Sequence, residues 1–393
     1  MQPLWIFTLL VYAAVVGVAV RRELTFGIFT LVVLGLPTWA VLSLTPHVGA
    51  AWPLLVAGHL AAALHLLALL LRPRLRPAWF RASVSIPGLG FAAASMLALP
   101  WLIAASLGFE PTGIFVPFAL AALGTIQTLY TRETTVDFVV DSDTEVEGLI
   151  RYPAAVGKPG PSARPLTLVQ ITDPHLGPYM SVARLRRICE RTVARDPDLV
   201  LITGDIMTME SQDEEAVVAA LAPLAALPGR VFACHGNHDL EARRVLERAY
   251  ARVGARLLID EAVTVQTPAG AVELLGLDFV WRGRNQHIDS VIARFPRTGA
   301  APRIVLLHDP GAFAHLPSGH GDLVLSGHTH GGQLGLLSLG LPHTFVSIVA
   351  KMPDHGPWAL GRNRLYVHRA QGVYGFPIRL GVPGEQSLMR VHF

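Results

Sequence analysis

The chain has 393 residues, of which 51% are hydrophobic and only 16% are charged. This composition excludes a protein that is soluble along its whole length, because soluble domains carry about a quarter of charged residues. The formal net charge is only +3 and comes largely from arginines beside apolar segments, which favours contact with anionic lipid heads over a nucleic-acid groove.

The excess of apolar residues lies before residue 131, in five runs that are each close to the roughly 20 residues needed to cross a bilayer. A single cleaved signal peptide does not explain so many runs. We therefore expect an α-helical transmembrane domain over residues 1–131, with the lipid bilayer as its partner. The predicted spans are Leu4–Val20, Thr25–Leu44, Ala51–Leu71, Pro87–Leu107 and Gly113–Tyr130.

Arginines in the short loops predict the orientation of these spans. Arg21 and Arg22 follow the first span and further arginines follow the third, whereas the loops after the second and fourth spans contain no Lys or Arg. Because Lys and Arg are enriched in cytoplasmic loops, loops one and three are expected inside. Five spans then predict a multi-pass protein of the cell (inner) membrane, with its second half in the cytoplasm. Loss of the fifth span alone would move that half outside.

Residues 132–165 are predicted to form a hairpin and a linker. The runs Thr135–Val140 and Glu145–Arg151 have the alternation of strands, and Asp141-Ser142-Asp143 between them is typical of a turn. The segment Pro153–Pro165 is rich in Pro, Gly and Ala and is expected to be an exposed connection.

From residue 166 onward, short runs of Val, Ile and Leu alternate with amphipathic helical patterns, as in an α/β domain with buried strands. The expected strands are Leu166–Thr172, Leu199–Thr203, Arg230–Cys234, Arg256–Asp260, Val263–Gln266, Val272–Gly276 and Ile304–Leu307. The expected helices are Ser181–Ala194 with Ser181 as N-cap, Asp213–Ala226, Leu240–Val253 and a weaker one near Ile288–Ala293.

Potential metal ligands follow several of these runs at the point where the strand ends. In open α/β sheets ligands bind outside the carboxyl ends of the strands, so these side chains are expected along one edge. In the segment SGHTHGGQ, two imidazoles would project to the same side if the backbone is extended. The candidate ligands are Asp173, His175, Asp205, Asn237, His308, His328 and His330.

The chemistry of this donor set points to two cations. It offers oxygen and nitrogen and no sulfur, which suits Mn²⁺, Fe or Zn²⁺ better than Mg²⁺ or Ca²⁺. Seven ligands are too many for one closed tetrahedral site but suit two divalent ions that share a carboxylate. Two ions about 3.5–4 Å apart form the usual clamp for in-line displacement at phosphorus.

The ordered motifs D-x-H, GD, GNHD, HD and GHTHGGQ resemble those of the calcineurin-like metallophosphoesterases, and the last is similar to that of a bacterial membrane-associated subgroup. The resemblance covers roughly residues 134 to 393. It implies a domain at 166–393 in which two mixed β-sheets pack as a sandwich flanked by helices.

The resemblance also implies the role of each motif residue. It implies that Asp205 bridges the two metal ions, and that His238 binds no metal but donates a hydrogen bond to the phosphate or a proton to the leaving oxygen. The implied first metal site is Asp173, His175, Asp205 and His330. The implied second site is Asp205, Asn237, His308 and His328.

Two acidic residues beside the motifs are expected to act indirectly. Asp239 is expected to cap the following helix, and Asp309 to fix a neighbouring imidazole.

Three departures from the family pattern bear on the substrate. The chain has Ala370-Gln371-Gly372 where the subgroup often has G-L-G, and Pro383-Gly384-Glu385 where it often has P-P-E. Both lie outside the ligand set and concern the shape of one pocket wall. The residues after Gly204-Asp205 lack the Asp-Arg pair of the Ser/Thr protein phosphatases, so a phosphoprotein substrate is not expected.

The resulting hypothesis is a membrane-bound, metal-dependent phosphoric ester hydrolase that acts on a phosphomonoester or phosphodiester of a lipid-linked or cell-envelope substrate. Similar enzymes hydrolyse UDP-2,3-diacylglucosamine, which is one specific alternative. A nuclease would need a basic, aromatic-lined groove, and the motifs have none beside them. An inactive metal-binding membrane scaffold would be expected to lack a ligand or His238, and this chain lacks neither. No protein partner is evident.

Overall fold

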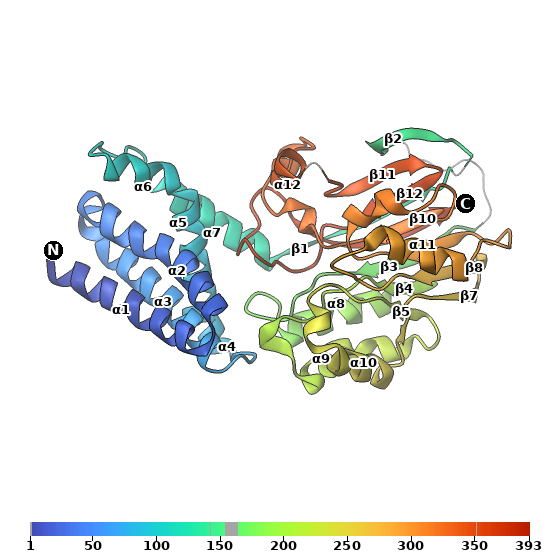
Figure 1. Ribbon diagram of the computed structural model, residues 1–393, viewed down its shortest axis with the longest axis horizontal. Helices are drawn as coiled ribbons and strands as arrows, with labels where there is room; N and C mark the ends of the chain where they lie inside the picture. Colours follow the sequence, from blue (N-terminus) through green and yellow to red (C-terminus); the bar gives the residue numbers. More distant parts are fainter. Residues whose placement is uncertain (1, 142, 154–163, 351) are drawn as a thin grey trace. The chain divides into compact units, whose positions relative to one another are not determined.

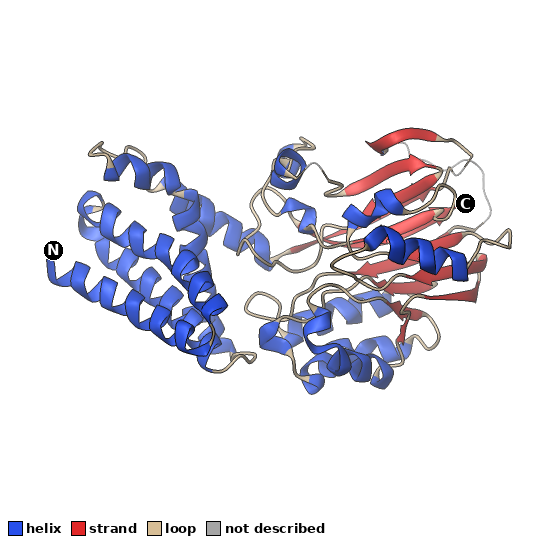
Figure 2. Cartoon of the chain, in the orientation of Figure 1, coloured by secondary structure: helices blue, strands red, loops and turns tan. Residues whose placement is uncertain are grey.

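The computed structural model describes residues 2–141, 143–153, 164–350 and 352–393 (Figure 1). The chain divides into two compact units. The helical unit comprises Met1–Leu129 together with the short segments Gly177–Tyr179 and Tyr374–Leu380. The sheet unit comprises Tyr130–Leu176, Met180–Val373 and Gly381–Phe393. Figure 2 shows helices in the first unit and all of the strands in the second.

The helical unit contains four helical segments long and apolar enough to cross a membrane, namely Gln2–Arg22, Leu24–His47, Gly49–Leu71 and Ala78–Leu97. They are built on the helices α1 (Gln2–Arg22), α2 (Leu24–Leu44), α3 (Trp52–Leu71), α4 (Ala78–Phe80) and α5 (Ile86–Leu97), the last two joined by the π-helical turn Arg81–Ser85. Two shorter helices, α6 (Leu99–Ser106) and α7 (Val116–Leu129), complete the unit.

The fourth and fifth predicted spans differ from these helices. The fourth helical segment starts at Ala78, and α5 ends at Leu97 because Pro100 in the first turn of α6 cannot continue its hydrogen-bond ladder. The fifth, α7, has 14 residues, which rise about 21 Å and fall short of the roughly 30 Å apolar layer of a bilayer. The described residues therefore give four helices of spanning length, where the sequence predicted five.

The sheet unit consists of two mixed β-sheets. In the first sheet β13 is antiparallel to β3, whereas β3, β4 and β5 run parallel. Its order is β1 (Thr131–Val139), β13 (Gly384–His392), β3 (Leu166–Ile171), β4 (Leu199–Ile202), β5 (Val231–Ala233) and β6 (Arg256–Leu257). The second sheet has the order β2 (Val146–Arg151), β11 (Gly356–Gly361), β12 (Asn363–Val367), β10 (Leu323–Ser326), β9 (Arg303–Leu306), β8 (Gly270–Gly276) and β7 (Glu261–Thr267).

The two sheets pack face to face, and helices flank them. Leu168 and Leu201 of the first sheet share one buried cluster with Ile304 and Leu325 of the second. The helices α8 (Val182–Ala194), α9 (Glu214–Leu221) and α10 (Arg243–Arg252) lie beside the first sheet in Figure 1. The helix α11 (Arg284–Arg294) packs its apolar face on the second sheet. The predicted class, helices followed by a flanked sandwich of mixed sheets, is confirmed.

Helix boundaries follow local chemistry. The Ser181 hydroxyl accepts a hydrogen bond from Arg184 N at 3.1 Å, so the predicted N-cap of α8 is confirmed. The helix α9 ends at Leu221, before a 3₁₀ segment that carries Pro223 in its first turn. The predicted helix Leu240–Val253 begins instead as a 3₁₀ turn and becomes α-helical at Arg243.

The predicted hairpin is wrong in its pairing, although both strands form. The strand β1 runs parallel to β13, from Thr131 opposite Gly384 to Val139 opposite His392. The strand β2 pairs antiparallel with β11 in the other sheet. Alternation identifies a strand but not its partner, and here the partners come from the last 40 residues of the chain. Most of the predicted linker Pro153–Pro165 lies outside the described residues.

Candidate metal centre

The seven predicted ligands all follow strands, and the chain brings them together. Asp173 follows β3, Asp205 follows β4 and Asn237 follows β5, all in the first sheet. His308 follows β9 in the second sheet, and His328 and His330 follow β10, a strand that the sequence did not predict. The strands of both sheets thus deliver their carboxyl-end loops to one site, as expected for an α/β sheet.

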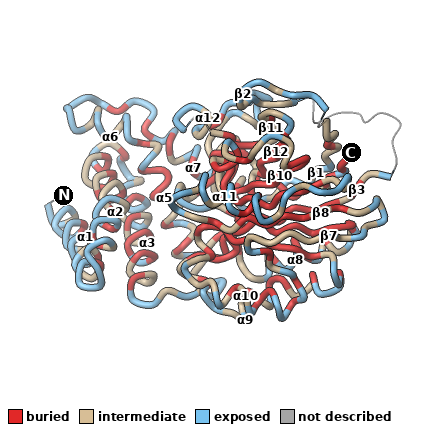
Figure 3. The backbone as a smooth tube through the Cα atoms, turned by 45° about the vertical axis from the view of Figure 1, so that its right-hand side comes forward, coloured by how far each residue is buried: buried red, intermediate tan, exposed pale blue. Residues whose placement is uncertain are grey.

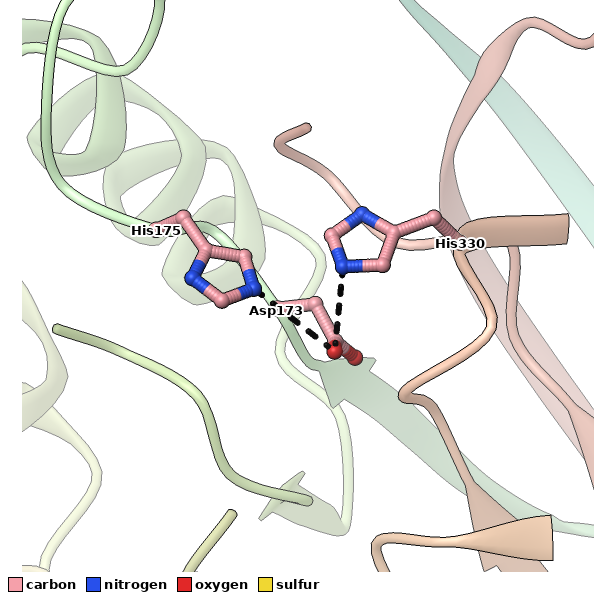
Figure 4. A group of neighbouring side chains, drawn as sticks. All are labelled: Asp173, His175 and His330. Carbon is pink, nitrogen blue, oxygen red and sulfur yellow. Dashed lines mark ion pairs between the residues drawn. The ribbon is translucent and has the colours of Figure 1, made fainter. Parts of the chain in front are cut away.

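The first group of donors is Asp173, His175 and His330, shown in Figure 4. Their candidate ligand atoms all lie within 4.8 Å of one another. His330 Nε2 is 3.5 Å and His175 Nε2 is 4.0 Å from Asp173 Oδ1. The two imidazole rings stack with their centroids 5.0 Å apart. All three residues are buried, so that an ion among them would be shielded from water.

The second group is Asp205, His308 and His328, again with ligand atoms within 4.8 Å of one another. His328 Nδ1 and His308 Nε2 are 3.2 Å apart. Asn237, the remaining predicted ligand, joins this group, because its Oδ1 lies 3.2 Å from His308 Nε2. Two imidazole nitrogens and an amide oxygen that face one point form a donor set suited to a divalent cation.

Asp205 lies between the two groups. Its Oδ2 is 3.3 Å from His308 Nε2 in the second group and 3.5 Å from His175 Nε2 in the first. Its other oxygen accepts a hydrogen bond from His238 N at 2.8 Å. This geometry fits a carboxylate shared by two cations.

The ligand loops have an unusual backbone. Asp173, His175, Asp205, His328 and His330 all have positive φ, between 47° and 66°. Non-glycine residues in this region cost of order 1–3 kcal/mol each and cluster at functional sites. The extended backbone on which the common direction of His328 and His330 was predicted is therefore wrong. Instead, the two imidazoles belong to different groups, as the family resemblance implied.

Hydrogen bonds on the far side of the imidazoles orient them. His308 Nδ1 donates to Thr203 O at 2.7 Å, and His330 Nδ1 donates to Gly372 O at 3.4 Å. Each bond directs Nε2 of the same ring toward the carboxylates, which is the usual arrangement around protein metals.

Burial and the charges of neighbouring side chains shift the pKa values of the site residues in different directions. Burial raises the pKa of the Asp173 carboxyl to about 7, and the neighbouring Asp205 charge adds to the rise. Burial alone would lower the pKa of His308, but Asp205 and Asp173 raise it to about 10. Burial lowers the pKa of His175 to about 3 and, together with the positive charge of His308, that of His328 to about 4.

Two glycines, Gly327 and Gly236, leave space for the carboxylates of Asp173 and Asp205. A Cβ on Gly327 would lie 2.0 Å from Asp173 Oδ2, and one on Gly236 would lie 2.1 Å from Asp205 Oδ1. Neither position can carry a larger residue unless the carboxylate moves.

Asp239 does not cap the following helix. Its carboxylate is fully buried and accepts hydrogen bonds from the backbone N–H groups of Asp205, Ile206, Met207 and Gly236 at 2.7–3.3 Å. It thereby holds the loop that carries Asp205. Asp309 contacts no imidazole by a hydrogen bond in the described contacts; it pairs with Arg284 at 2.6 Å and accepts from Gly311 N at 2.8 Å.

His238 lies beside the first group without joining it. Its ring centroid is 5.3 Å from that of His175, and its Nδ1 is 3.1 Å from Glu241 Oε1. A carboxylate at Nδ1 fixes the ring and its tautomer. The sequence analysis missed Glu241, for which only its spacing of three residues from His238 could have served as a signal.

The departure Ala370-Gln371-Gly372 lies behind Asp173. Gln371 Oε1 accepts from Thr172 N at 2.8 Å, and its Nε2 donates to Gln170 O at 3.1 Å. Gly372 N donates to Asp173 O at 3.0 Å. Ala370, where the subgroup often has glycine, has a φ of 65°. The Gln371 side chain thus forms hydrogen bonds with backbone groups at the end of β3, as a neighbouring strand would.

A pocket that adjoins the second group could not be predicted from the sequence. Its lining includes Phe279, Arg284 and His308. The Phe279 ring lies 6.1 Å from the His308 ring and makes an edge contact with Trp281, which is 66% exposed.

Comparison with known proteins agrees with this geometry. The family model described as calcineurin-like phosphoesterase matches residues 166–332. The chain is 29% identical over 249 residues to "Phosphodiesterase YaeI" of Escherichia coli, covering 62% of this chain and 87% of that protein. An uncharacterized metallophosphoesterase of Helicobacter pylori is 28% identical over 235 residues, covering 58% and 60%. A "Transmembrane protein with metallophosphoesterase domain" of Danio rerio is 26% identical over 279 residues, covering 65% and 61%.

Proposed function

We propose that the chain is a membrane-anchored, metal-dependent phosphodiesterase with two divalent ions, because residues 166–332 match the calcineurin-like phosphoesterase family model and the described residues form two candidate metal groups. One observation carries the proposal. Seven donor side chains from five loops converge in two adjoining groups, with Asp205 Oδ2 between them at 3.3 and 3.5 Å from the nearest imidazole of each. The donor chemistry suits Mn²⁺, Fe or Zn²⁺.

Each group of residues has its own role in the proposed reaction. Divalent cations, when bound to the two groups, supply positive charge for the phosphoryl oxygens and lower the pKa of a water. On one side of the phosphate site, a cation would be held by Asp173, His175 and His330. On the other side, a cation would be held by Asn237, His308 and His328. His238, fixed through Nδ1 by Glu241, donates a proton from Nε2 to the departing alkoxide. Asp239 keeps the Asp205 loop in register for this geometry.

Hydrolysis of bis-p-nitrophenyl phosphate by the purified full-length protein in detergent, with and without Mn²⁺, tests the proposal. We expect Mn²⁺-dependent hydrolysis, with kcat lowered at least about a hundredfold in both Asp205→Asn and His238→Ala, because general acid catalysis alone contributes 10²–10⁴-fold. Asp196→Asn is a matched control, since Asp196 is an exposed carboxylate that pairs with Arg230. Unchanged rates in both site variants would contradict the catalytic assignment.

The anchoring helices favour a lipid-linked or cell-envelope phosphoester as the substrate. Four helices have the length and composition of membrane spans, and β1 begins one residue after α7. The domain that carries the site is therefore joined to the apolar helices by a single residue. A UDP-2,3-diacylglucosamine-type pyrophosphate is the alternative substrate, because it is also lipid-linked. The word phosphodiesterase in the name of the Escherichia coli relative supports a diester first.

We propose that the enzyme belongs to the cell (inner) membrane and that its catalytic part is cytoplasmic. Within the helical unit, Arg22 donates to Leu70 O, so the arginine-bearing ends of α1 and α3 lie together. At the opposite end His47 Nδ1 is 3.2 Å from Glu110 Oε2, and the loops there contain no Lys or Arg. Arginine-rich ends are cytoplasmic.

The short helix α7 supports the same orientation. Arg81, at the start of the fourth helical segment, donates to Pro178 O at 3.0 Å. The neighbouring Tyr179 hydroxyl interacts with the Thr125 side chain in the last turns of α7. The end of α7 is therefore on the arginine-rich side of the helical unit, although α7 is shorter than a full span.

A further inference from the structure

The loop of residues 327–333, which carries His328 and His330, is called the metal loop below. The segment directly after it exposes large apolar side chains. Residues 334–350 (LGLLSLGLPHTFVSIVA) contain no Asp, Glu, Lys or Arg. We call this segment the apolar lobe. Six of its side chains are between 42% and 74% exposed to solvent: Leu336, Leu339, Leu341, Phe345, Ile348 and Val349.

No other part of the described sheet unit has such a cluster. Its remaining exposed large apolar side chains are single residues far apart in the sequence, namely Tyr130, Ile150, Ile259, Trp281 and Phe393. Isolated exposed apolar residues are normal on soluble surfaces, whereas a cluster marks an interaction site. In Figure 3 the backbone of the lobe is drawn mainly in the colours of exposed and half-buried residues.

The apolar lobe is an ordered hairpin and not a loose loop. Leu336 N donates to His343 O at 2.9 Å, and Phe345 N donates to Leu334 O at 2.8 Å. The second arm continues into the short helix α12 (Phe345–Val349), whose first turn is capped by the Thr344 hydroxyl. Phe345, Ile348 and Val349 are spaced by three and four residues and therefore share one face of α12.

Asp354 ties the base of the lobe to the metal loop. It is fully buried, and its carboxylate accepts a hydrogen bond from the Thr344 hydroxyl and pairs with Arg151. Its carbonyl oxygen accepts a hydrogen bond at 2.6 Å from Thr329, which stands between the two histidines of the metal loop. The lobe is therefore linked through Asp354 to the residues that carry His328 and His330.

The lobe is hydrogen-bonded to the residue at which the chain leaves the helical unit. Ser338 N donates to Gly381 O at 2.8 Å, and Leu334 forms a β-bridge with Gly381. Gly381 is the first residue after the segment Tyr374–Leu380, which belongs to the helical unit. Within that unit, Arg379 N donates to the Thr128 hydroxyl of α7 at 2.7 Å. The lobe is therefore joined through Gly381 to a segment of the unit that contains the four helices of spanning length.

We propose that the apolar lobe inserts into the lipid leaflet next to the helices, with its Leu, Phe, Ile and Val side chains among the acyl chains. An uncharged hairpin with an apolar helical face suits the boundary between headgroups and acyl chains. The inserted lobe holds the metal loop at the level of the lipid headgroups. This inference rests on the proposed membrane anchoring and adds to it the surface that orients the active site.

Depth-dependent fluorescence quenching tests the insertion. The full-length protein carries an environment-sensitive fluorophore on Leu339→Cys, in proteoliposomes of phosphatidylethanolamine and phosphatidylglycerol. Both native cysteines, Cys189 and Cys234, are fully buried and do not compete for the label. Ala251→Cys on α10 is the matched control, because it is exposed on a helix of the sheet unit with charged neighbours.

We expect doxyl-labelled lipids to quench the Leu339→Cys label several-fold more than the Ala251→Cys label, and iodide in the buffer to do the reverse. Equal iodide quenching at both positions would overturn the proposal. A Leu339→Cys label protected from iodide but not quenched by doxyl lipid would also overturn it, in favour of a second copy of the chain as the occupant. Hydrolysis of bis-p-nitrophenyl phosphate by the same labelled proteins reports the proposed function separately, since that substrate needs no membrane.

Discussion

At the scale of single residues, the departures from the family pattern have physical consequences. Ala370 stands where the membrane-associated subgroup often has glycine, and it keeps the φ of 65° that glycine would adopt at little cost. The chain tolerates the strain because neighbours fix the residue on both sides: Ala370 N donates to His368 Nδ1, and Ala370 O accepts from Glu385 N.

Ala370→Gly should therefore stabilise the protein. We expect the free energy of unfolding to rise by about 0.5–1 kcal/mol. The left-handed conformation costs an L-residue about 1–2 kcal/mol, and the greater conformational entropy of glycine in the unfolded chain offsets part of the relief. The midpoint of thermal unfolding in detergent measures the change. A lower midpoint would mean that the Ala370 methyl group contributes more through packing than the backbone loses through strain.

Glu385 offers a prediction about pH. Burial alone would raise the pKa of its carboxyl, but the charges of His368 and Arg369 and the hydrogen bond from the Tyr366 hydroxyl hold that pKa below its ordinary value of 4.5. A depressed pKa in the folded state means that the carboxylate stabilises the fold above pH 4.5 and that this contribution is lost as the pH falls further.

Glu385→Gln should lower the free energy of unfolding at pH 7 by about 3 kcal/mol, because it leaves the Arg369 charge without its carboxylate in a buried site. The deficit should narrow below about pH 4.5, where the carboxyl takes up a proton in the unfolded chain while it stays charged in the folded protein. Unfolding midpoints between pH 4 and pH 8 measure both effects. Glu190→Gln, at an exposed pair with Arg186, should change the midpoint little at any pH, and a constant deficit for Glu385→Gln would refute the explanation.

At the scale of elements, the loop between β5 and α10 holds the metal centre through one side chain. Asp239→Asn should lower the free energy of unfolding by about 1–3 kcal/mol, because an amide NH₂ would face backbone N–H groups that now donate to a carboxylate. We also expect a lower kcat for the soluble diester, since the Asp205 loop loses its support. Parallel measurements of melting and of diester hydrolysis test both effects.

The matched control is Asp213→Asn at the N-cap of α9, where the side chain accepts a hydrogen bond from Glu215 N and asparagine serves equally well. Similar behaviour of the two variants would show that Asp239 does no more than an ordinary cap.

Strand positions and ligand loops could be predicted from the sequence, because each buried run of Val, Ile and Leu ends at a polar motif. Pairing could not be predicted. The edge strand β1 pairs with residues 384–392, and nothing in its alternating pattern specifies a partner some 250 residues away. The role of Asp239 was missed for a related reason, since its hydrogen bonds to residues 205–207 exist only once β4 and β5 lie side by side.

The division of the ligands into two groups was predicted from the family resemblance and not from the spacing of the residues. The extended backbone assumed around His328 and His330 would have aimed both rings at one cation. The positive φ of both residues instead sends them to different groups. The pocket residue Phe279 had no signal in the sequence, because its ring meets that of His308 only through the fold of the second sheet.

At the scale of the whole molecule, the orientation in the membrane is the main open prediction. Labelling of intact cells with a membrane-impermeant maleimide tests it, because the native cysteines are buried. Thr112→Cys, in the loop between α6 and α7, should react from outside, whereas Ala251→Cys should react only after the membrane is permeabilised. Labelling of both from outside would assign the catalytic part to the outer side and reverse the proposal.

The single residue between α7 and β1 has a kinetic consequence if the substrate is a lipid. On so short a tether, the enzyme and such a substrate meet by lateral diffusion in two dimensions. The turnover rate then follows the mole fraction of the phosphoester in the bilayer rather than its amount per volume of suspension. Diluting the substrate with inert lipid would slow the reaction, whereas diluting the vesicles with buffer would not.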